Sequence, residues 1–521
     1  MWKIILLQVF CICLSNADIY CPFETKRSGV LECKRLGLRL NILTSSDVLA
    51  GVIWTEIDTL KMRSLGILEV AGPAFISAKP IKKLDLSTNL ISFLGAGCFQ
   101  PLTNLQFLNI SQNSIVTEDI DLEAFKGLNN DLRELDLSGN YLSVNAELAK
   151  RLKPLKKLRF LDISNNSNFD VTSMSFGPSL QHLIASNLET TLQKKSLDKA
   201  VSLRNLILKN SQIQSIPDGL LDLCVLLVRV DLSSNLIKAI PGKLFSRNTR
   251  LEEIDISNNR LITLIDDSTF ASNGNLKTLD FSRNNVTEIG AQLFSQNTNL
   301  VELNMGVNKL TALPANVFDT LVNLQLLNLC DNALTELPDL IFSKLTDLDS
   351  LSLSGNVFKS LSENLFESNI RLRQLHLSDN KLEVLTSEMF TSLTSLTILN
   401  LSHNRLVTLP PLLVSMESLM SLYVPCNMMT YLPDEFFSVS PEIGKTVVLG
   451  GNPWRCSCLS KMLDVANANE LTYMDNTFSN GKTVTCVATK NDTSCESPLT
   501  IKEYADWEAI VNLYPEICKP L

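Results

Sequence analysis

Histidine is scarce in this chain, and the motifs that carry most enzymatic and metal chemistry are missing. The only histidines among its 521 residues are His182, His376 and His403. No glycine-rich phosphate loop follows a strand and opens a helix, and no paired Cys-x-x-Cys motifs occur. These absences predict a protein that is not an enzyme and that uses no cofactor and no metal.

Charge and hydropathy argue against two further kinds of partner. Acidic residues outnumber basic ones by 55 to 46, and the formal net charge is −9. Because no basic stripe appears, nucleic acid and anionic membranes are poor candidate partners. No stretch after residue 17 approaches the roughly 20 uninterrupted apolar residues of a membrane helix. The C-terminal segment also has no hydrophobic tail for a glycolipid anchor.

Residues 1–17 have the pattern of a secretory signal peptide. Lys3 precedes an apolar run, and Ser15 and Ala17 supply the small residues of a cleavage site. We therefore expect a secreted, extracellular chain that begins at Asp18.

Most of the remaining chain follows an apolar pattern with a period close to 24 residues. In one copy, Leu324, Leu327 and Leu329 are the inward residues of a short strand. Asn332 lies in the next turn, where its side chain can satisfy unpaired backbone groups. Phe342 fills the interior from the returning segment. Since no copy buries its apolar edge alone, the copies are predicted to stack into an α/β solenoid, a horseshoe with a concave parallel β-sheet.

The same template gives about 16 copies between residues 57 and 443. They begin at Ile57, Ile81, Leu105, Leu132, Leu158, Leu180, Leu203, Leu227, Leu251, Leu276, Leu300, Leu324, Leu348, Leu372, Leu396 and Leu419. Leu188 and Ser211 replace the asparagine of the template in two copies, and the leucine spacing is irregular in residues 167–200. This stretch is either a functional loop or a drifting repeat, and we favour the drifting repeat.

Cysteines cluster at the two ends of the repeat region. A solenoid exposes its core at both ends, and disulfide-stapled caps would seal it in an oxidising compartment. We expect an N-terminal cap at residues 18–56 and a C-terminal cap at residues 444–521. The disulfide cysteines are predicted to be Cys21, Cys33, Cys456, Cys458, Cys486, Cys495 and Cys518.

Taken together, the signal peptide, the capped 24-residue repeats with Leu-Pro returns and the segment Asn452–Cys458 (Asn-Pro-Trp-Arg-Cys-Ser-Cys) carry a family resemblance. The chain resembles the extracellular leucine-rich-repeat proteins, which include Toll and Toll-like receptor ectodomains, Slit and the secreted leucine-rich immune proteins of mosquitoes. Within that group it is most similar to the coil-less secreted immune members. Its C-terminal cap departs from the usual four cysteines, because five are present.

The resemblance implies recognition of an extracellular protein or glycan, commonly in innate immunity or cell adhesion. We therefore predict a secreted protein-binding module. The alternative is a structural extracellular-matrix protein whose repeats space or coat other molecules without a discrete ligand. A defined stoichiometric complex in solution would favour the binding module over the matrix component.

Two sets of outward residues resemble ligand sites. His376 and His403 are expected on neighbouring strands with Asp379 close by, which suggests a metal-binding or pH-sensing pair. Solvated surface histidines are the favoured alternative. Aspartates that recur at one outward strand position suggest an acidic track, although aspartate is common there in such repeats and ordinary repeat chemistry is favoured. They are Asp85, Asp136, Asp162, Asp231, Asp255 and Asp280.

Sequons and outward apolar residues give the candidate surface sites. N-glycans are expected at some of the sequons Asn109, Asn165, Asn285, Asn400 and Asn491. Exposed apolar clusters often mark interaction sites, and the outward apolar residues gather toward the C-terminal end of the repeats. The candidate protein-binding residues are Leu326, Ile398, Met420, Tyr423 and Met428.

Eleven cysteines follow the signal peptide, so they cannot all pair within one chain. Cys98 and Cys224 are expected as buried thiols, and Cys21 pairs with Cys33. The inter-chain candidates are then a leftover cap cysteine, Cys330 and Cys426. Cys518 is favoured because it lies near the terminus, with Cys495 as the alternative. The odd thiol predicts a disulfide-linked dimer or heteromer.

Overall fold

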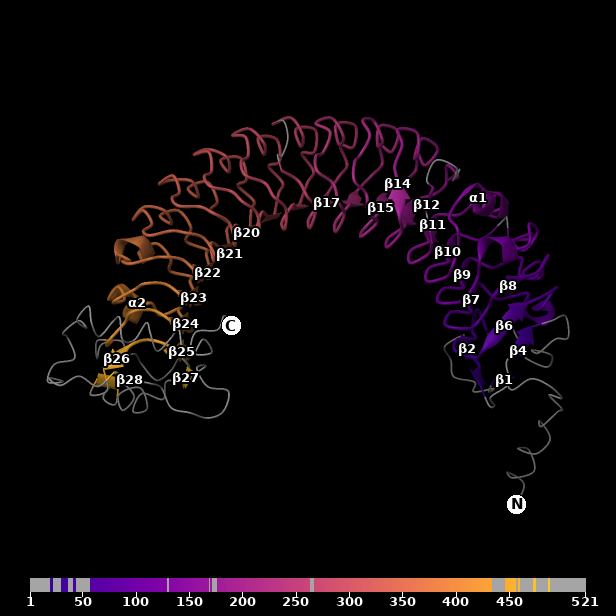
Figure 1. Ribbon diagram of the computed structural model, residues 1–521, viewed down its shortest axis with the longest axis horizontal. Coiled ribbons are helices and arrows are strands. Elements are labelled where there is room, and N and C mark those ends of the chain that lie inside the picture. Colours follow the sequence, from indigo (N-terminus) through magenta and orange to yellow (C-terminus); the bar gives the residue numbers. More distant parts are fainter. Residues whose placement is uncertain are drawn as a thin grey trace, which may run out of the picture. The chain divides into compact units, whose positions relative to one another are not determined.

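A computed structural model gives the structure of the chain. It describes residues 19–21, 30–35, 41–43, 57–128, 131–167, 169–170, 176–262, 267–432, 446–455, 458–459, 472–474 and 486–487. The chain divides into two compact units, Met1–Leu251 and Glu252–Leu521. In each unit, short strands from successive coils lie side by side along one side of the coils (Figure 1).

The first unit contains one long parallel sheet and three small sheets. The long sheet consists of β2 (Val30–Glu32), β5 (Thr59–Lys61), β7 (Lys83–Asp85), β9 (Phe107–Asn109), β10 (Glu134–Asp136), β11 (Phe160–Asp162), β13 (His182–Ile184), β15 (Asn205–Ile207) and β16 (Arg229–Asp231). The small sheets pair β1 (Ile19–Tyr20) with β3 (Lys34–Arg35), β4 (Asn41–Leu43) with β6 (Ile67–Val70) and β8 (Phe93–Leu94), and β12 (Phe169–Asp170) with β14 (Thr190–Thr191). Its described helices are α1 (Ala146–Leu152) and the 3-10 turns η3 (Ile76–Ala78) and η4 (Thr117–Asp119).

The second unit continues the same pattern. Its parallel sheet consists of β17 (Glu253–Asp255), β18 (Thr278–Asp280), β19 (Glu302–Asn304), β20 (Leu326–Asn328), β21 (Ser350–Ser352), β22 (Gln374–His376), β23 (Ile398–Asn400), β24 (Ser421–Tyr423), β25 (Thr446–Val448) and β27 (Thr472–Met474). A separate pair joins β26 (Trp454–Arg455) to β28 (Cys486–Val487). Its described helices are α2 (Leu412–Ser415) and the 3-10 turn η5 (Glu388–Phe390).

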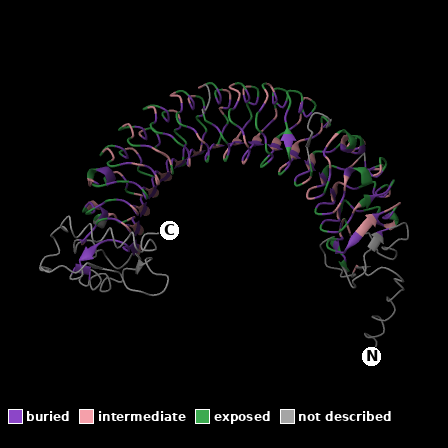
Figure 2. Ribbon diagram, in the orientation of Figure 1, coloured by how far each residue is buried: buried purple, intermediate pink, exposed green. Residues whose placement is uncertain are grey.

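The predicted solenoid of stacked coils is confirmed, and a strand begins two residues after every predicted start. Most of these strands bury only their middle residue, as the alternation of inward and outward side chains requires. Figure 2 shows the exposed residues mainly in the loops that connect the strands. Leu327, Leu329 and Phe342 are buried as expected, whereas Leu337 in the same returning segment is only half-buried.

Asparagine side chains tie consecutive coils together. Asn356 accepts a hydrogen bond from the backbone N–H of Leu334 in the preceding coil at 3.1 Å. Its Nδ2 donates to the carbonyls of Leu329 and Leu353, each at 3.0 Å. One buried amide therefore satisfies backbone groups of two coils, which explains why the asparagine recurs once per copy.

The irregular stretch keeps the stacking of the sheet despite its poor leucine register. The irregular stretch adds the small sheet of β12 and β14. In the copy that follows it, Ser211 replaces the asparagine, and its hydroxyl lies within hydrogen-bond distance of the carbonyls of Ala185 at 3.1 Å and Lys209 at 3.0 Å. Ser211 thus retains the donor role of the amide, as a drifting repeat would.

A column of stacked phenylalanines fills the core opposite the strands. Phe294, Phe318, Phe342 and Phe366 have ring centroids 6.3–6.4 Å apart in successive coils, and each is fully buried. Phe75, Phe99 and Phe125 form the same column in the first unit, at 6.0 and 6.1 Å. Phe99, Phe318 and Phe342 therefore each stack on a phenylalanine ring in the coils on both sides, which favours a regular coil spacing there.

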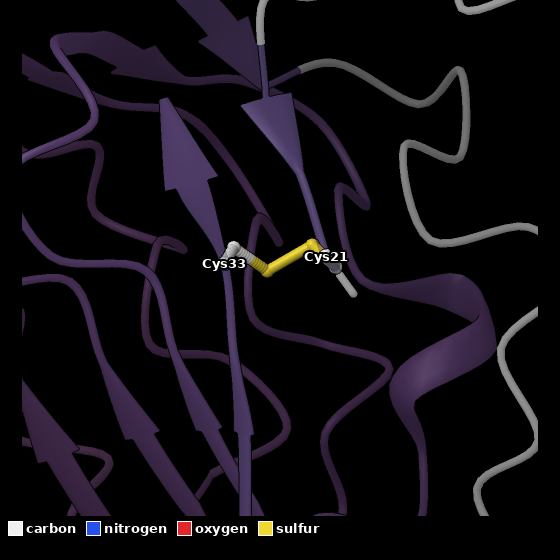
Figure 3. Close-up of a disulfide and its surroundings, with 2 residues drawn as sticks. All are labelled: Cys21 and Cys33. Atoms are coloured by element: carbon white, nitrogen blue, oxygen red, sulfur yellow. A yellow bond between two sulfur atoms is a disulfide. The ribbon is translucent and has the colours of Figure 1, made fainter. Parts of the chain in front are cut away.

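Disulfides lie near both ends of the repeat region. Cys21 and Cys33 are joined as predicted, which is consistent with an N-terminal cap (Figure 3). Cys458 is also disulfide-bonded. Of Cys486 only the backbone is described, while Cys456, Cys495, Cys518 and residues 1–17 lie outside the described residues. The helices in the described parts of the chain include none with the length and apolar character of a membrane span.

Candidate binding face

Two outward columns of side chains run along the sheet of the second unit. The strand register places equivalent residues directly beside each other, such as Asn400 between His376 and Tyr423. The first column is Glu253, Thr278, Glu302, Leu326, Ser350, Gln374, Ile398 and Ser421, and the second is Asp255, Asp280, Asn304, Asn328, Ser352, His376, Asn400 and Tyr423. Carboxylates therefore occupy the beginning of this face, and larger neutral side chains its end.

The predicted binding residues are accessible but do not form a single patch. Met420 is 53% exposed, Leu326 39% and Met428 37%, while Ile398 and Tyr423 are half-buried. Ile398 and Tyr423 lie on the adjacent strands β23 and β24, and Met420 lies directly before β24 with its N–H donated to the carbonyl of Thr397. These three can contact one partner together.

The other two candidates lie apart from this group. Leu326 is on β20, three strands from Ile398. Met428 follows the turn at Asn427, where its N–H donates to the carbonyl of Leu406. We define the terminal patch as Ile398, Met420 and Tyr423.

Leu326 instead borders a groove at the edge where the strands begin. This groove has a volume of about 490 Å³, and its lining includes Val301, Gln325, Leu326, Asp349 and Arg373. Arg373 pairs with Asp349 at 3.5 Å across one coil. The groove is therefore polar, and the ion pair leaves it without a strong net charge.

A second groove of about 510 Å³ continues along the same edge and shares Val301 and Gln325 with the first. Here Lys277 pairs with Glu252 at 2.7 Å, and Asn299 donates to the carbonyl of Gly274 at 2.8 Å. The sequence reasoning missed both grooves. A sequence feature could have indicated them. Residues of opposite charge directly follow the first leucine of consecutive copies, as Asp349 and Arg373 do.

The histidine pair is arranged differently from the prediction. His376 lies in β22, but His403 lies in the turn after β23 with φ 53°, so the expectation that both lie on strands is wrong. The strands are only three residues long, and position 403 falls beyond the strand end. Burial lowers the pKa of His376, which disfavours a charged imidazole there. Within the described ranges, His, Cys, Asp and Glu side chains form no group of three or more suited to a metal ion.

The recurring aspartates have a structural role. The Oδ1 of Asp255 accepts hydrogen bonds from the N–H of Ser257 at 2.9 Å and from its hydroxyl at 2.6 Å. The same backbone bond occurs at Asp85, Asp136, Asp162, Asp231 and Asp280. The ordinary-repeat interpretation is therefore confirmed, because each carboxylate already closes the turn that ends its strand.

In two coils, a sequon asparagine occupies the strand position that aspartate occupies in the copies described above. Asn400 accepts from the N–H and hydroxyl of Ser402 through Oδ1, and Asn109 accepts from Ser111 in the same way. Asn165 lies instead in a turn, with φ 54°. Asn491 lies outside the described residues.

We expect N-glycans at some of these sequons, because each presents the acceptor motif and Nδ2 is the atom that is glycosylated. A glycan on Asn400 would stand beside Tyr423 on the terminal patch and restrict docking there. Glycopeptide mass spectrometry of protein secreted from animal cells, with enzymatically deglycosylated protein as the control, measures each site. Five unmodified sequons would contradict the expectation.

One of the four cysteines within the repeats differs from the prediction. Cys98, Cys224 and Cys330 are free thiols, whereas Cys426 is disulfide-bonded, so its listing as an inter-chain candidate is wrong. Burial raises the pKa of Cys224 to about 12 and also raises that of Cys98, in agreement with inert buried thiols.

Cys330 is the only free thiol among the described residues that is not fully buried. Cys518 and Cys495 lie outside the described residues, so the disulfide-linked dimer or heteromer stays a prediction.

Comparison with known proteins agrees with the geometry. A model described as leucine rich repeat matches residues 56–115, 274–329, 322–382 and 370–429, and one described as BspA type leucine rich repeat region matches residues 174–301. Together they cover more than half of the chain. Nephrocan of Mus musculus is 30% identical over 131 residues, which are 25% of this chain and 24% of that protein, so the match spans about a quarter of its length.

Two solved structures share the fold. One is the Toll–Spatzle complex of Drosophila, with a TM-score of 0.70, 20% identity and coverage of 86% of this chain and 68% of that chain. The other is the LRIM1/APL1C complex, with a TM-score of 0.54, 18% identity and coverage of 75% and 69%. At these identities the likeness concerns the fold alone.

Proposed function

Because this chain belongs to the leucine-rich-repeat proteins, we propose that it is a secreted, non-enzymatic module that binds another extracellular protein through its sheet. The observation that carries the proposal is the terminal patch at the end of the sheet in the second unit. Met420 is 53% exposed there, next to the half-buried Tyr423 and Ile398. Methionine adapts to an irregular partner surface and tyrosine is a frequent binding anchor.

The similar structures support binding as the role of the fold. The Toll and LRIM1 structures are both complexes with a second protein. For this chain we propose a role in innate immunity or cell adhesion. Its short strands present rows of outward side chains on a rigid backbone, which suits recognition, since binding residues need little ordering on contact.

The remaining organisation of the chain is part of the same proposal. Residues 1–17 would be the signal peptide, residues 18–56 and 444–521 the cysteine caps, and residues 57–443 the repeats. The disulfides at Cys21–Cys33, Cys426 and Cys458 support an oxidising, extracellular location.

Substituting Met420→Asp together with Tyr423→Asp should weaken partner binding by roughly tenfold or more. A carboxylate buried at a binding anchor loses its water without gaining a partner. The partner would first be isolated with the wild-type chain from extracellular fluid under non-reducing conditions. Binding would then be measured with the purified pair by surface plasmon resonance.

Val384→Asp with Val407→Asp is the matched control. Both valines are exposed, at 60% and 46%, but lie in the connecting segments rather than on the strands. The control should bind like the wild type. Equal affinity of the Met420 and Tyr423 variant would instead place the binding surface elsewhere on the chain.

A further inference from the structure

A row of arginines marks the edge where strands begin in the first unit. Arg133, Arg159 and Arg204 directly precede the strands β10, β11 and β15, and all three are exposed. The N–H of Arg159 donates to the carbonyl of Arg133 at 2.7 Å, and the N–H groups of Gln181 and Arg204 continue the row at 2.8 and 2.7 Å. The row from Arg133 to Arg204 therefore spans three strand spacings, about 14 Å.

Lysines extend this row onto the turn before β11. Lys153, Lys156 and Lys157 are exposed between α1 and Arg159. Lys153 and Lys156 also line a groove of about 550 Å³ whose floor includes Leu155. From residue 148 to residue 161 the chain has six basic residues and no acidic one.

We define the basic edge as Arg133, Lys153, Lys156, Lys157, Arg159 and Arg204. In the described part of the first unit, none of these six forms an ion pair, whereas Lys150 and Arg151 nearby pair with Glu147. Burial and, after it, Arg204 lower the pKa of the neighbouring His182, while Glu134 acts in the opposite direction.

In the second unit, the basic side chains at the equivalent positions are ion-paired. Lys277 is paired with Glu252, Arg371 with Asp347 and Arg373 with Asp349. The uncompensated charge of the basic edge is thus a local property of the first unit. The expectation from composition that no basic stripe exists is wrong, because a net charge of −9 hides a local cluster.

We propose that the basic edge binds a linear sulfated polysaccharide. Guanidinium groups form paired hydrogen bonds with sulfate oxygens as they do with phosphate, and a row of cations at regular spacing matches a chain with repeated sulfates. Clusters of lysine and arginine in a short segment are typical of heparin-binding patches. This site belongs to the first unit and the terminal patch to the second, and the proposal does not depend on that patch.

Features around the edge favour a glycan over a nucleic acid. Binding of single strands relies on aromatic side chains that stack on bases. Phe160, which directly follows Arg159, is half-buried and packs against His182 with ring centroids 6.2 Å apart. The sequon Asn109 is the last residue of β9, and Asn165 lies in the turn after β11, so N-glycans on them would be attached away from the edge where strands begin.

The test compares two triple variants of the full chain that lose equal charge. The edge variant is Lys157→Gln, Arg159→Gln and Arg204→Gln. The control is Arg371→Gln, Arg373→Gln and Lys277→Gln, which occupy the equivalent positions of their copies but are ion-paired. Binding to immobilised heparin is measured by surface plasmon resonance between about 0.05 and 0.3 M NaCl, where screening changes strongly.

We expect the edge variant to bind heparin at least about tenfold more weakly than the wild type at about 0.15 M NaCl, with a shallower salt dependence. The heparin affinity of the control should stay within about twofold of the wild type, because it loses the same number of positive charges but keeps the basic edge. Hyaluronan, which carries carboxylates but no sulfates, should bind far more weakly than heparin.

Three outcomes would overturn the proposal: equal loss in the two variants, equal binding of hyaluronan, or tighter binding of single-stranded DNA or phosphatidylserine vesicles than of heparin. All six substituted side chains are exposed, and matching thermal unfolding curves would show that the variants fold. The Met420 and Tyr423 variant should keep its heparin affinity, so failure of this proposal is distinguishable from failure of the protein-binding function.

Discussion

Replacing Phe342 with alanine should lower the free energy of unfolding by about 3–5 kcal/mol, the range typical of a buried phenylalanine truncated to a methyl group. Phe342 is fully buried and stacked between Phe318 and Phe366, with ring centroids 6.3 Å away on each side. The substitution leaves a cavity in the middle of the column, and both neighbouring rings lose a contact. Urea unfolding followed by circular dichroism measures the change.

Leu340→Ala is the control for this experiment. Leu340 lies two residues away in the same segment but is 55% exposed, so its truncation should change the free energy of unfolding by no more than about 0.5 kcal/mol. Phe342→Leu should fall between the two, since it keeps most of the side-chain volume. If Phe342→Ala cost no more than Leu340→Ala, the stacked column would not be a source of stability.

Replacing Asn356 with alanine should cost about 2–5 kcal/mol, because the side chain satisfies several buried backbone groups at once. Its loss leaves the N–H of Leu334 and the carbonyls of Leu329 and Leu353 without this partner in the buried interior. Asn356 itself is 4% exposed. Hydrogen exchange of the Leu334 amide should accelerate, and urea unfolding gives the total loss.

Asn299→Ala tests whether the effect belongs to burial rather than to asparagine as such. Asn299 donates one hydrogen bond to the carbonyl of Gly274, but it is exposed, and water can replace the amide. Its removal should cost about 1 kcal/mol or less. Comparable losses at the two sites would remove the argument that the buried amides hold the coils together.

The repeat architecture could be predicted because one short-range rule generates all of it. Each coil needs inward residues at alternate strand positions and one amide in the turn, so Leu327, Leu329 and Asn356 recur at a fixed spacing. The same rule made the structural interpretation of Asp255 correct. Such features depend only on a residue's position within its coil, and that position can be read directly from the repeat pattern of the sequence.

Features that depend on neighbouring coils escaped the same reasoning. A list of outward residues does not distinguish the sheet face from its edge, so Leu326, Met420 and Met428 were grouped although they lie in three places. The basic edge was missed because net charge averages over the chain, and only the register shows that Arg133 and Arg159 are adjacent. Disulfide bonding of Cys426 was missed because the repeat template considered only its position within its own coil.

The asparagine bridges also bear on how such chains change in length. Asn332, Asn356 and Asn380 make matching contacts, with Oδ1 accepting from the N–H 22 residues earlier and Nδ2 donating to the carbonyls 27 and 3 residues earlier. Excising one period between equivalent points would bring together two coil faces that already fit each other. Copy number can therefore change by duplication or loss of a whole coil without the invention of a new interface. Coils of other lengths keep the same contacts, because Asn140 accepts from the N–H 25 residues earlier and donates to the carbonyls 30 and 3 residues earlier.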